Sequence, residues 1–152
     1  MLHLRDTCTL ESPPERIWPR IFDPISLMGM IPGCEHIEEV APGEYRGRMR
    51  VGIAAVAGVF DTLVRVLESD PPHTCRLHGE VSGPTGVIAG EAAFRLEAAG
   101  EQTVLAYEGS AMITGALGQM NPRFVEGVAR TLIQHGLHKL NRELRGEEVL
   151  PE

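Results

Sequence analysis

The chain has 152 residues, and its 14 Lys and Arg against 21 Asp and Glu give a formal net charge of −7 at pH 7. This length suits one domain with a real hydrophobic core. An acidic chain with only 5% aromatic residues is poorly suited to phosphate backbones or stacked bases, so we expect no nucleic-acid partner. No apolar run approaches the roughly 20 residues that span a bilayer, so we expect at most peripheral membrane contact.

The cysteines and the N-terminus bear on the compartment. Cys8, Cys34 and Cys75 form an odd set without a CxxC pair, which favours reduced, structural thiols. The N-terminus enters an alternating strand pattern directly, without the pattern of a signal peptide. We expect a cytoplasmic protein, with a peripheral position at the inner face of the membrane as the alternative.

The first third of the chain predicts one strand followed by two short helices. Apolar and polar residues alternate over 2–10. Pro13-Pro14 predicts a helix start with Ser12 as its cap, and Asp23-Pro24 predicts the end of that helix. A second short helix is expected from Pro24 to Ile31.

Further strands are expected at 35–40, 44–53, 56–68, 74–81, 86–97 and 103–114, with turn residues between them.

A long amphipathic helix is predicted over 121–145. Its apolar residues recur at three- and four-residue spacing, Asn121 suits the N-cap, and Gly146 suits the position after the end. Gly127 and Gly136 inside it indicate either close helix–sheet contact or room left beneath the helix. A single long helix buries its apolar side on the concave face of a bent antiparallel sheet, so we expect an α+β helix-grip fold. Residues 1–146 form its one domain and 147–152 a frayed tail.

The segment after the second short helix reads Ile31-Pro32-Gly33-Cys34-Glu35. Together with Asp23-Pro24 it resembles the signature of the carbon monoxide dehydrogenase G-subunit family, which belongs to the START-like, helix-grip superfamily. Residues 68–72, 115–119 and 127–130 resemble a strand-ending turn and the entry into the last helix of that family.

The resemblance implies a seven-stranded sheet wrapped on the long helix, with an apolar cavity between them. It also implies an accessory role for a molybdenum-containing carbon monoxide dehydrogenase or a related hydroxylase, linked to membrane attachment and to a lipophilic quinone. Longer members carry a hydrophobic or amphipathic C-terminal tail, whereas this sequence stops at Glu152, so we expect no membrane anchor of its own.

The apolar residues expected to point inward are the candidate ligand contacts. An ordinary filled core is the alternative, but few large aromatics and many Gly and Ala residues favour a cavity. Tyr107 could offer its hydroxyl to a ligand carbonyl. The candidate ligand-binding residues are Leu27, Met49, Phe60, Phe94, Tyr107, Phe124, Val128 and Leu132.

Other reactive residues do not form a recognisable catalytic motif. His135 and His138 can share a helix face, but a metal site needs a further converging ligand, such as His73 or His78, so we expect no metal. Cys34 follows Pro-Gly with His36 nearby, and a packed thiol is the favoured interpretation. We therefore assign no catalytic residue.

Two charged features have open roles. Asp6 falls on the apolar face of the first strand, where it is a satisfied core acid, a site residue or a sign of strand twist. Arg46, Arg48 and Arg50 form an outward stripe that either pairs with acids on the neighbouring strand or docks an anionic surface.

Three functions are compatible with these patterns. The favoured hypothesis is a non-enzymatic protein that binds a quinone-like molecule, without an intrinsic cofactor, and serves a molybdenum hydroxylase. The second is a cyclase- or hydrolase-type enzyme using the same cavity, with Asp6, Tyr107 or a histidine as its only acid–base candidates. The third is an assembly subunit with a filled core that acts through its surface. A homodimer is compatible with each.

Overall fold

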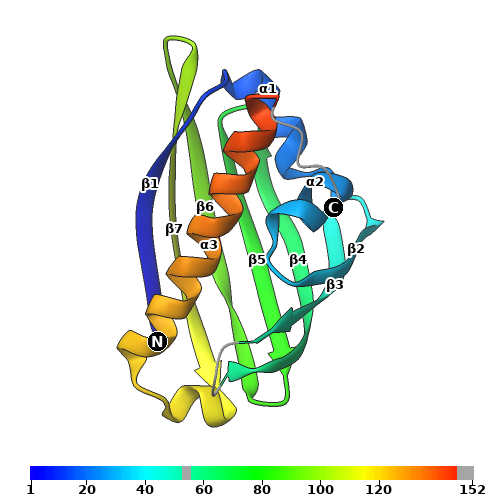
Figure 1. The fold of residues 1–152 in the computed structure, drawn as a ribbon, viewed down its shortest axis with the longest axis vertical. Helices are drawn as coiled ribbons and strands as arrows, with labels where there is room; N and C mark the ends of the chain where they lie inside the picture. The colour runs from blue at the N-terminus through cyan, green and yellow to red at the C-terminus, as the bar shows by residue number, and fades with distance from the viewer. Residues whose placement is uncertain (53–55, 147–152) are drawn as a thin grey trace.

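The computed structural model describes residues 1–52 and 56–146. Seven strands form one antiparallel sheet in the order β1-β7-β6-β5-β4-β3-β2, and α3 lies across one face of it (Figure 1). The predicted α+β helix-grip fold is therefore confirmed. The elements are β1 (Leu2–Leu10), α1 (Pro14–Ile21), α2 (Pro24–Met30), β2 (Cys34–Ala41), β3 (Glu44–Val51), β4 (Gly58–Asp70), β5 (Thr74–Gly83), β6 (Gly86–Ala99), β7 (Gln102–Thr114), the 3₁₀ helix η2 (Gly115–Gln119) and α3 (Pro122–Leu144).

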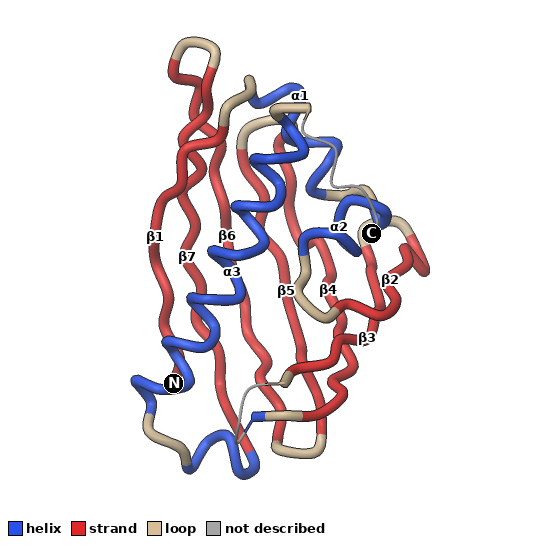
Figure 2. Tube along the Cα trace, in the orientation of Figure 1, coloured by secondary structure: helices blue, strands red, loops and turns tan. Residues whose placement is uncertain are grey.

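The sheet is built from neighbouring hairpins plus one long crossover. The connection through α1 and α2 carries the chain from β1 at one edge to β2 at the other (Figure 1). The β6–β7 hairpin extends beyond the other strands at one end (Figure 2). The strand predicted over 44–53 ends at Val51, and its predicted last residue, Ile53, lies outside the described residues, as does the predicted tail 147–152.

Local side-chain signals fix the ends of α2 and α3. The Asn121 side chain accepts a hydrogen bond from Arg123 N–H at 2.9 Å, and Gly146 has the positive φ of 76° that suits a residue after a helix. Asp23 caps α2 by accepting from Ile25 N–H at 3.1 Å. The prediction that Ser12 caps α1 is wrong. Pro13 is the N-cap, and the backbone oxygen of Ser12 instead accepts a hydrogen bond from Thr103 Oγ1.

Two apolar clusters divide the space between α3 and the sheet. The first is closely filled and includes contacts among Trp18, Phe22 and Phe94, with ring centroids 5.1 to 6.3 Å apart. Its buried members are Leu10, Ile17, Leu96, Leu105, Leu140 and Leu144. The second lies under the N-terminal half of α3, and its buried members are Met49, Val56, Phe60 and Leu117. Side chains that border open space surround this second cluster.

Polar contacts hold the short helices against α3. Glu143 of α3 pairs with Arg20 at 2.7 Å and accepts a hydrogen bond from Ser26 Oγ at 3.0 Å. The Tyr45 hydroxyl donates to the backbone oxygen of Phe22 at 2.9 Å, which ties β3 to the end of α1. These contacts fix the end of the grip at which α1 and α2 meet α3.

The two glycines inside α3 have different environments. A Cβ on Gly136 would lie 2.9 Å from the backbone oxygen of Met30, so this glycine allows α2 and α3 to approach closely. A Cβ on Gly127 would meet nothing within 4 Å. The close contact at Gly136 is therefore with α2 and not with the sheet as predicted, and Gly127 is not needed for any packing contact that the structure describes.

Candidate ligand-binding site

An apolar pocket of about 450 Å³ lies under α3. Helix α3 forms its roof, and strands β3 to β6 form its floor. The connection between α2 and β2 and the helix η2 form its sides. The lining is almost wholly hydrocarbon and comprises Leu2, Met30, Ile31, Pro32, Met49, Val51, Val56, Phe60, Val81, Ile88, Leu117, Val125, Val128, Ala129, Leu132, Ile133, Gly136 and Leu137.

A second apolar pocket of about 400 Å³ adjoins the first along the middle of the sheet. The two share lining residues from β1, β3, β5, β6 and α3 and from the connection between α2 and β2, so they lie side by side in the apolar space under α3. Tyr107 borders the second pocket and also packs against the filled cluster, which places it where the open space meets the solid core. The shared residues are Leu2, Ile31, Met49, Val81, Ile88 and Ile133.

The structure brings together part of the predicted ligand-binding set. Met49, Phe60, Val128 and Leu132 line the first pocket, and Tyr107 borders the second. The other three lie elsewhere: Phe94 packs on Trp18, Leu27 is a half-buried residue of α2 outside both linings, and Phe124 is 40% exposed at the start of α3. Ligand binding by any of these residues stays a prediction.

Sequence periodicity missed the lining contributed by connections between elements. Ile31 and Pro32 lie between α2 and β2, and Leu117 lies in η2, where no strand or helix pattern assigns an inward face. The available signal was the Ile31–Glu35 motif, whose first two residues line the pocket.

A group of polar side chains joins β1 to α3 beside this apolar space; we call Asp6, Tyr107, Glu126 and Arg130 the β1–α3 seam. Asp6 and Tyr107 are register partners, so both point to the inner face. Arg130 donates to Asp6 Oδ2 at 3.2 Å and to Glu126 Oε1 at 3.0 Å. The second Asp6 oxygen accepts from Thr7 N–H at 2.8 Å. Asp6 is therefore a satisfied acid, but with 39% of its side chain exposed it is not a core residue.

Burial and local charge affect the acid–base properties of groups near the seam. Burial, followed by the negative charge of Asp6, raises the pKa of the Tyr107 hydroxyl, and the positive charge of Arg130 opposes this shift. Burial and Asp6 also raise the pKa of the Cys8 thiol. Tyr107 therefore stays a protonated hydrogen-bond donor at neutral pH.

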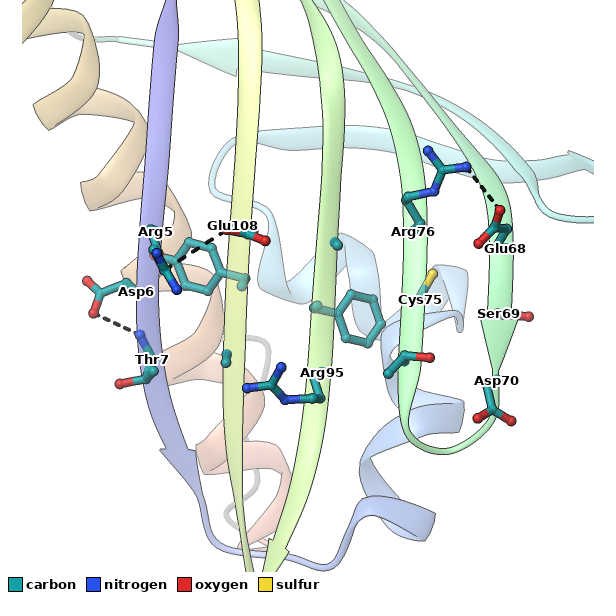
Figure 3. A pocket seen from close by; sticks show the side chains of 15 residues that line it. Arg5, Asp6, Thr7, Glu68, Ser69, Asp70, Cys75, Arg76, Arg95 and Glu108 are labelled. Carbon is teal, nitrogen blue, oxygen red and sulfur yellow. Dashed lines mark hydrogen bonds and ion pairs between the residues drawn. The ribbon is translucent and has the colours of Figure 1, made fainter.

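The outer face of the sheet has a hollow of about 580 Å³, seen in Figure 3 from the side opposite α3. Its rim carries Arg5, Arg76 and Arg95, which pair with Glu108, Glu68 and Glu97 respectively. Exposed pairs of this kind contribute about 0–1 kcal/mol each. An open hollow lined by charged side chains of both signs is a poor site for a lipophilic molecule, although it is larger than either inner pocket.

The histidines of α3 and Cys34 were the candidates for a metal site and for a reactive thiol. His135 and His138 lie exposed on α3, and no group of three metal-binding side chains occurs within residues 1–52 and 56–146. Cys34 donates to the His36 backbone oxygen at 3.5 Å, and burial raises the pKa of its thiol. These contacts suit the packed-thiol interpretation.

The arginine stripe of β3 is paired with acids. Arg46 contacts Glu44 at 3.7 Å, Arg48 contacts Asp61 at 3.8 Å and Arg50 contacts Glu35 at 3.1 Å. Asp61 and Glu35 lie on the neighbouring strands β4 and β2, whereas Glu44 lies on β3 itself, so the structure favours pairing with acids over a free cationic patch. Among the described helices, none is both long and apolar enough to cross a bilayer.

The fold and the space beneath α3 define a helix-grip protein of the START-like class. The sequence model of a family described as the G subunit of carbon monoxide dehydrogenase (CoxG) matches residues 7–145, and the chain belongs to that family. No match was found among curated proteins.

Solved structures share this fold along nearly the whole chain. A conserved protein from Geobacillus kaustophilus is 29% identical with a TM-score of 0.91, covering 95% of this chain and 96% of its own. A START superfamily protein from Mycobacterium smegmatis is 15% identical with a TM-score of 0.73, covering 96% and 99%. A protein from Thermus thermophilus is 17% identical with a TM-score of 0.70, with the same coverage.

Proposed function

We propose that this protein is a non-enzymatic binding protein that holds a lipophilic small molecule, such as a quinone, between α3 and the sheet. The observation that carries the proposal is the apolar space beneath α3, whose first part measures about 450 Å³. Small-molecule sites commonly measure about 300–1,000 Å³ and are mostly apolar with few polar groups. Tyr107 would contact the polar end of the ligand.

The hydrophobic effect supplies the affinity in this proposal. Burying about 500 Å² of ligand hydrocarbon contributes roughly 12 kcal/mol. Lost translational and rotational freedom costs at least about 4 kcal/mol, so the net value corresponds to a micromolar dissociation constant. That affinity allows the protein both to take up and to release a ligand.

A carrier fits the polar contacts better than a catalyst does. Both carboxylate oxygens of Asp6 already accept hydrogen bonds, from Thr7 N–H and from Arg130. A general base needs a carboxylate oxygen within reach of the substrate proton. In this proposal Asp6 holds Arg130 in position and contributes negative charge, and no residue is catalytic.

Membership of the CoxG family of carbon monoxide dehydrogenase supports a partner as well as a ligand. We propose that the protein serves a molybdenum carbon monoxide dehydrogenase or a related hydroxylase by carrying quinone between that enzyme and the membrane surface. When the quinone-loaded protein is added to the purified enzyme, the bound quinone should then accept the electrons that the enzyme takes from its substrate. Equal rates with loaded and unloaded protein would contradict this part of the proposal.

Native mass spectrometry tests the binding function. Protein purified from its own host should carry a lipophilic mass that is lost on denaturation. Protein that is bare, and still bare after incubation with a panel of quinones, would contradict the proposal and favour a surface-acting assembly protein.

A pair of α3 variants links that mass to the pocket. Val128→Phe adds bulk to the lining and should reduce ligand occupancy at least five-fold. Thr131→Phe places the same ring on the exposed side of α3 and should leave occupancy unchanged. Equal occupancy in the two variants would place the ligand outside the space under α3.

A further inference from the structure

The β1–α3 seam brings charge close to Tyr107, the one seam residue that lines the second apolar pocket. Asp6 and Tyr107 share the inner face of neighbouring strands, and Tyr107 borders the apolar space. Arg130 reaches across from α3 to Asp6 at 3.2 Å. A ligand that lies along the sheet with its polar end toward Tyr107 would contact that residue and come near the charges behind it.

The seam has a net negative charge. Arg130 contributes one positive charge, and it is shared between the carboxylates of Asp6 and Glu126, at 3.2 and 3.0 Å. One guanidinium against two carboxylates leaves one negative charge. A carboxylate on a ligand would be repelled there.

Tyr107 has a hydroxyl available for a ligand. It makes no hydrogen bond to any residue within the described parts of the chain, whereas Tyr45 already donates to the Phe22 backbone oxygen at 2.9 Å. A protonated phenol donates a hydrogen bond, so the complementary ligand group is a neutral acceptor such as a carbonyl or ether oxygen.

We propose that the β1–α3 seam makes the pocket selective for neutral lipophilic molecules that end in a hydrogen-bond acceptor, and that it discriminates against fatty-acid carboxylates. Tyr107 contacts the acceptor, while Asp6 and Glu126 exclude the anion. This inference rests on the proposed function, because it concerns the polar end of the same pocket.

Competition binding separates the inference from the function on which it rests. The reporter is N-phenyl-1-naphthylamine, a neutral fluorescent dye that measures only whether an apolar space accepts a ligand. Decylubiquinone should displace the dye at a concentration at least ten-fold lower than palmitate at pH 7.5. Failure of the dye and the quinone to bind would overturn both proposals; dye binding with palmitate equal to or tighter than quinone would overturn only the selectivity.

Two tyrosine variants test the donor. Tyr107→Phe should weaken decylubiquinone binding about three- to ten-fold and leave dye binding unchanged, because only the hydroxyl is lost. Tyr45→Phe makes the same chemical change at a hydroxyl already bonded to the protein and should leave the quinone-to-dye ratio unchanged. An unchanged ratio in Tyr107→Phe would overturn the role of Tyr107.

Two charge variants test the exclusion of anions. Asp6→Asn and Glu126→Gln each remove the net negative charge and should improve palmitate binding at least five-fold, with little effect on decylubiquinone. Asp61→Asn removes the exposed carboxylate that pairs with Arg48 and should change the binding of neither ligand. The readout is the palmitate-to-quinone ratio, which general loosening of the fold would not shift. An unchanged ratio in both seam variants would overturn the charge argument.

Discussion

Gly136 of α3 lies so close to the backbone oxygen of Met30 that a Cβ at this position would sit 2.9 Å from that oxygen. Gly136 and Met30 both line the first pocket. The closeness of α2 to α3 therefore helps to set one wall of the apolar space, and one missing side chain allows it.

The two glycines of α3 should respond oppositely to alanine. Gly127→Ala meets nothing within 4 Å and should stabilise the protein by about 0.5–1 kcal/mol through helix propensity. Gly136→Ala gains the same propensity but forces the backbone at Met30 to move, so it should destabilise by about 1–3 kcal/mol. Urea unfolding monitored by circular dichroism measures both. Equal stabilisation by the two substitutions would show that α2 moves freely relative to α3.

Truncation of leucines on α3 should show which end of the grip is filled. Leu140 is fully buried in the solid cluster, so Leu140→Ala should destabilise by about 2–5 kcal/mol. Leu132 already borders the open pocket and loses fewer contacts, so Leu132→Ala should cost about 1 kcal/mol or less. The comparison uses urea midpoints at constant m-value. Similar losses at the two positions would indicate that the space under α3 is filled.

The arrangement of the elements was largely predictable from the sequence because each depends on local patterns. Alternation placed Phe94 and Tyr107 on the inner face, and Asn121 and Gly146 marked the ends of α3. Ser12 was misassigned because two consecutive prolines follow it, and the helix begins one residue later than the cap prediction requires.

The extent of the pocket was not predictable from local patterns. An inward direction does not distinguish a side chain in the solid cluster, such as Phe94, from one beside open space, such as Phe60. The apolar spacing of α3 also included Phe124, which lies in the first turn of the helix and is 40% exposed. Arg130 as the partner of Asp6 depends on a contact across 124 residues, which no sequence spacing reveals.

The three thiols should react slowly with alkylating reagents at neutral pH. Burial raises the pKa of Cys8, Cys34 and Cys75, and the thiolate is the reactive form. Cys75 is only 3% exposed and should react last, at least ten-fold more slowly than in urea-unfolded protein. Iodoacetamide labelling followed by peptide mass spectrometry gives the order. Cys34 labelling as fast as a free thiol would restore its interpretation as an activated nucleophile.

The free energy of unfolding should fall in alkaline solution, and ionisation of Tyr45 and Tyr107 should account for part of that fall. Burial, as the main cause, raises the pKa of both Tyr45 and Tyr107 above the ordinary value of 10.0. The folded state therefore holds these protons more tightly than the unfolded state. The resulting stability is fully present below pH 10 and is lost as pH rises through the raised pKa values.

Urea unfolding at pH 8 and at pH 10.5 tests this linkage. The three thiols, whose ordinary pKa is 9.0, also have raised pKa values, and their contribution to stability is lost at a lower pH than that of the tyrosines. The measurements therefore compare variants in a background in which all three cysteines are changed to alanine. In that background, adding Tyr45→Phe and Tyr107→Phe should reduce the loss of stability between the two pH values. Tyr45→Phe should also cost about 1 kcal/mol at pH 8, because the Phe22 backbone oxygen loses its donor. An unchanged alkaline loss after both substitutions would show that neither hydroxyl is held in its protonated form by the fold.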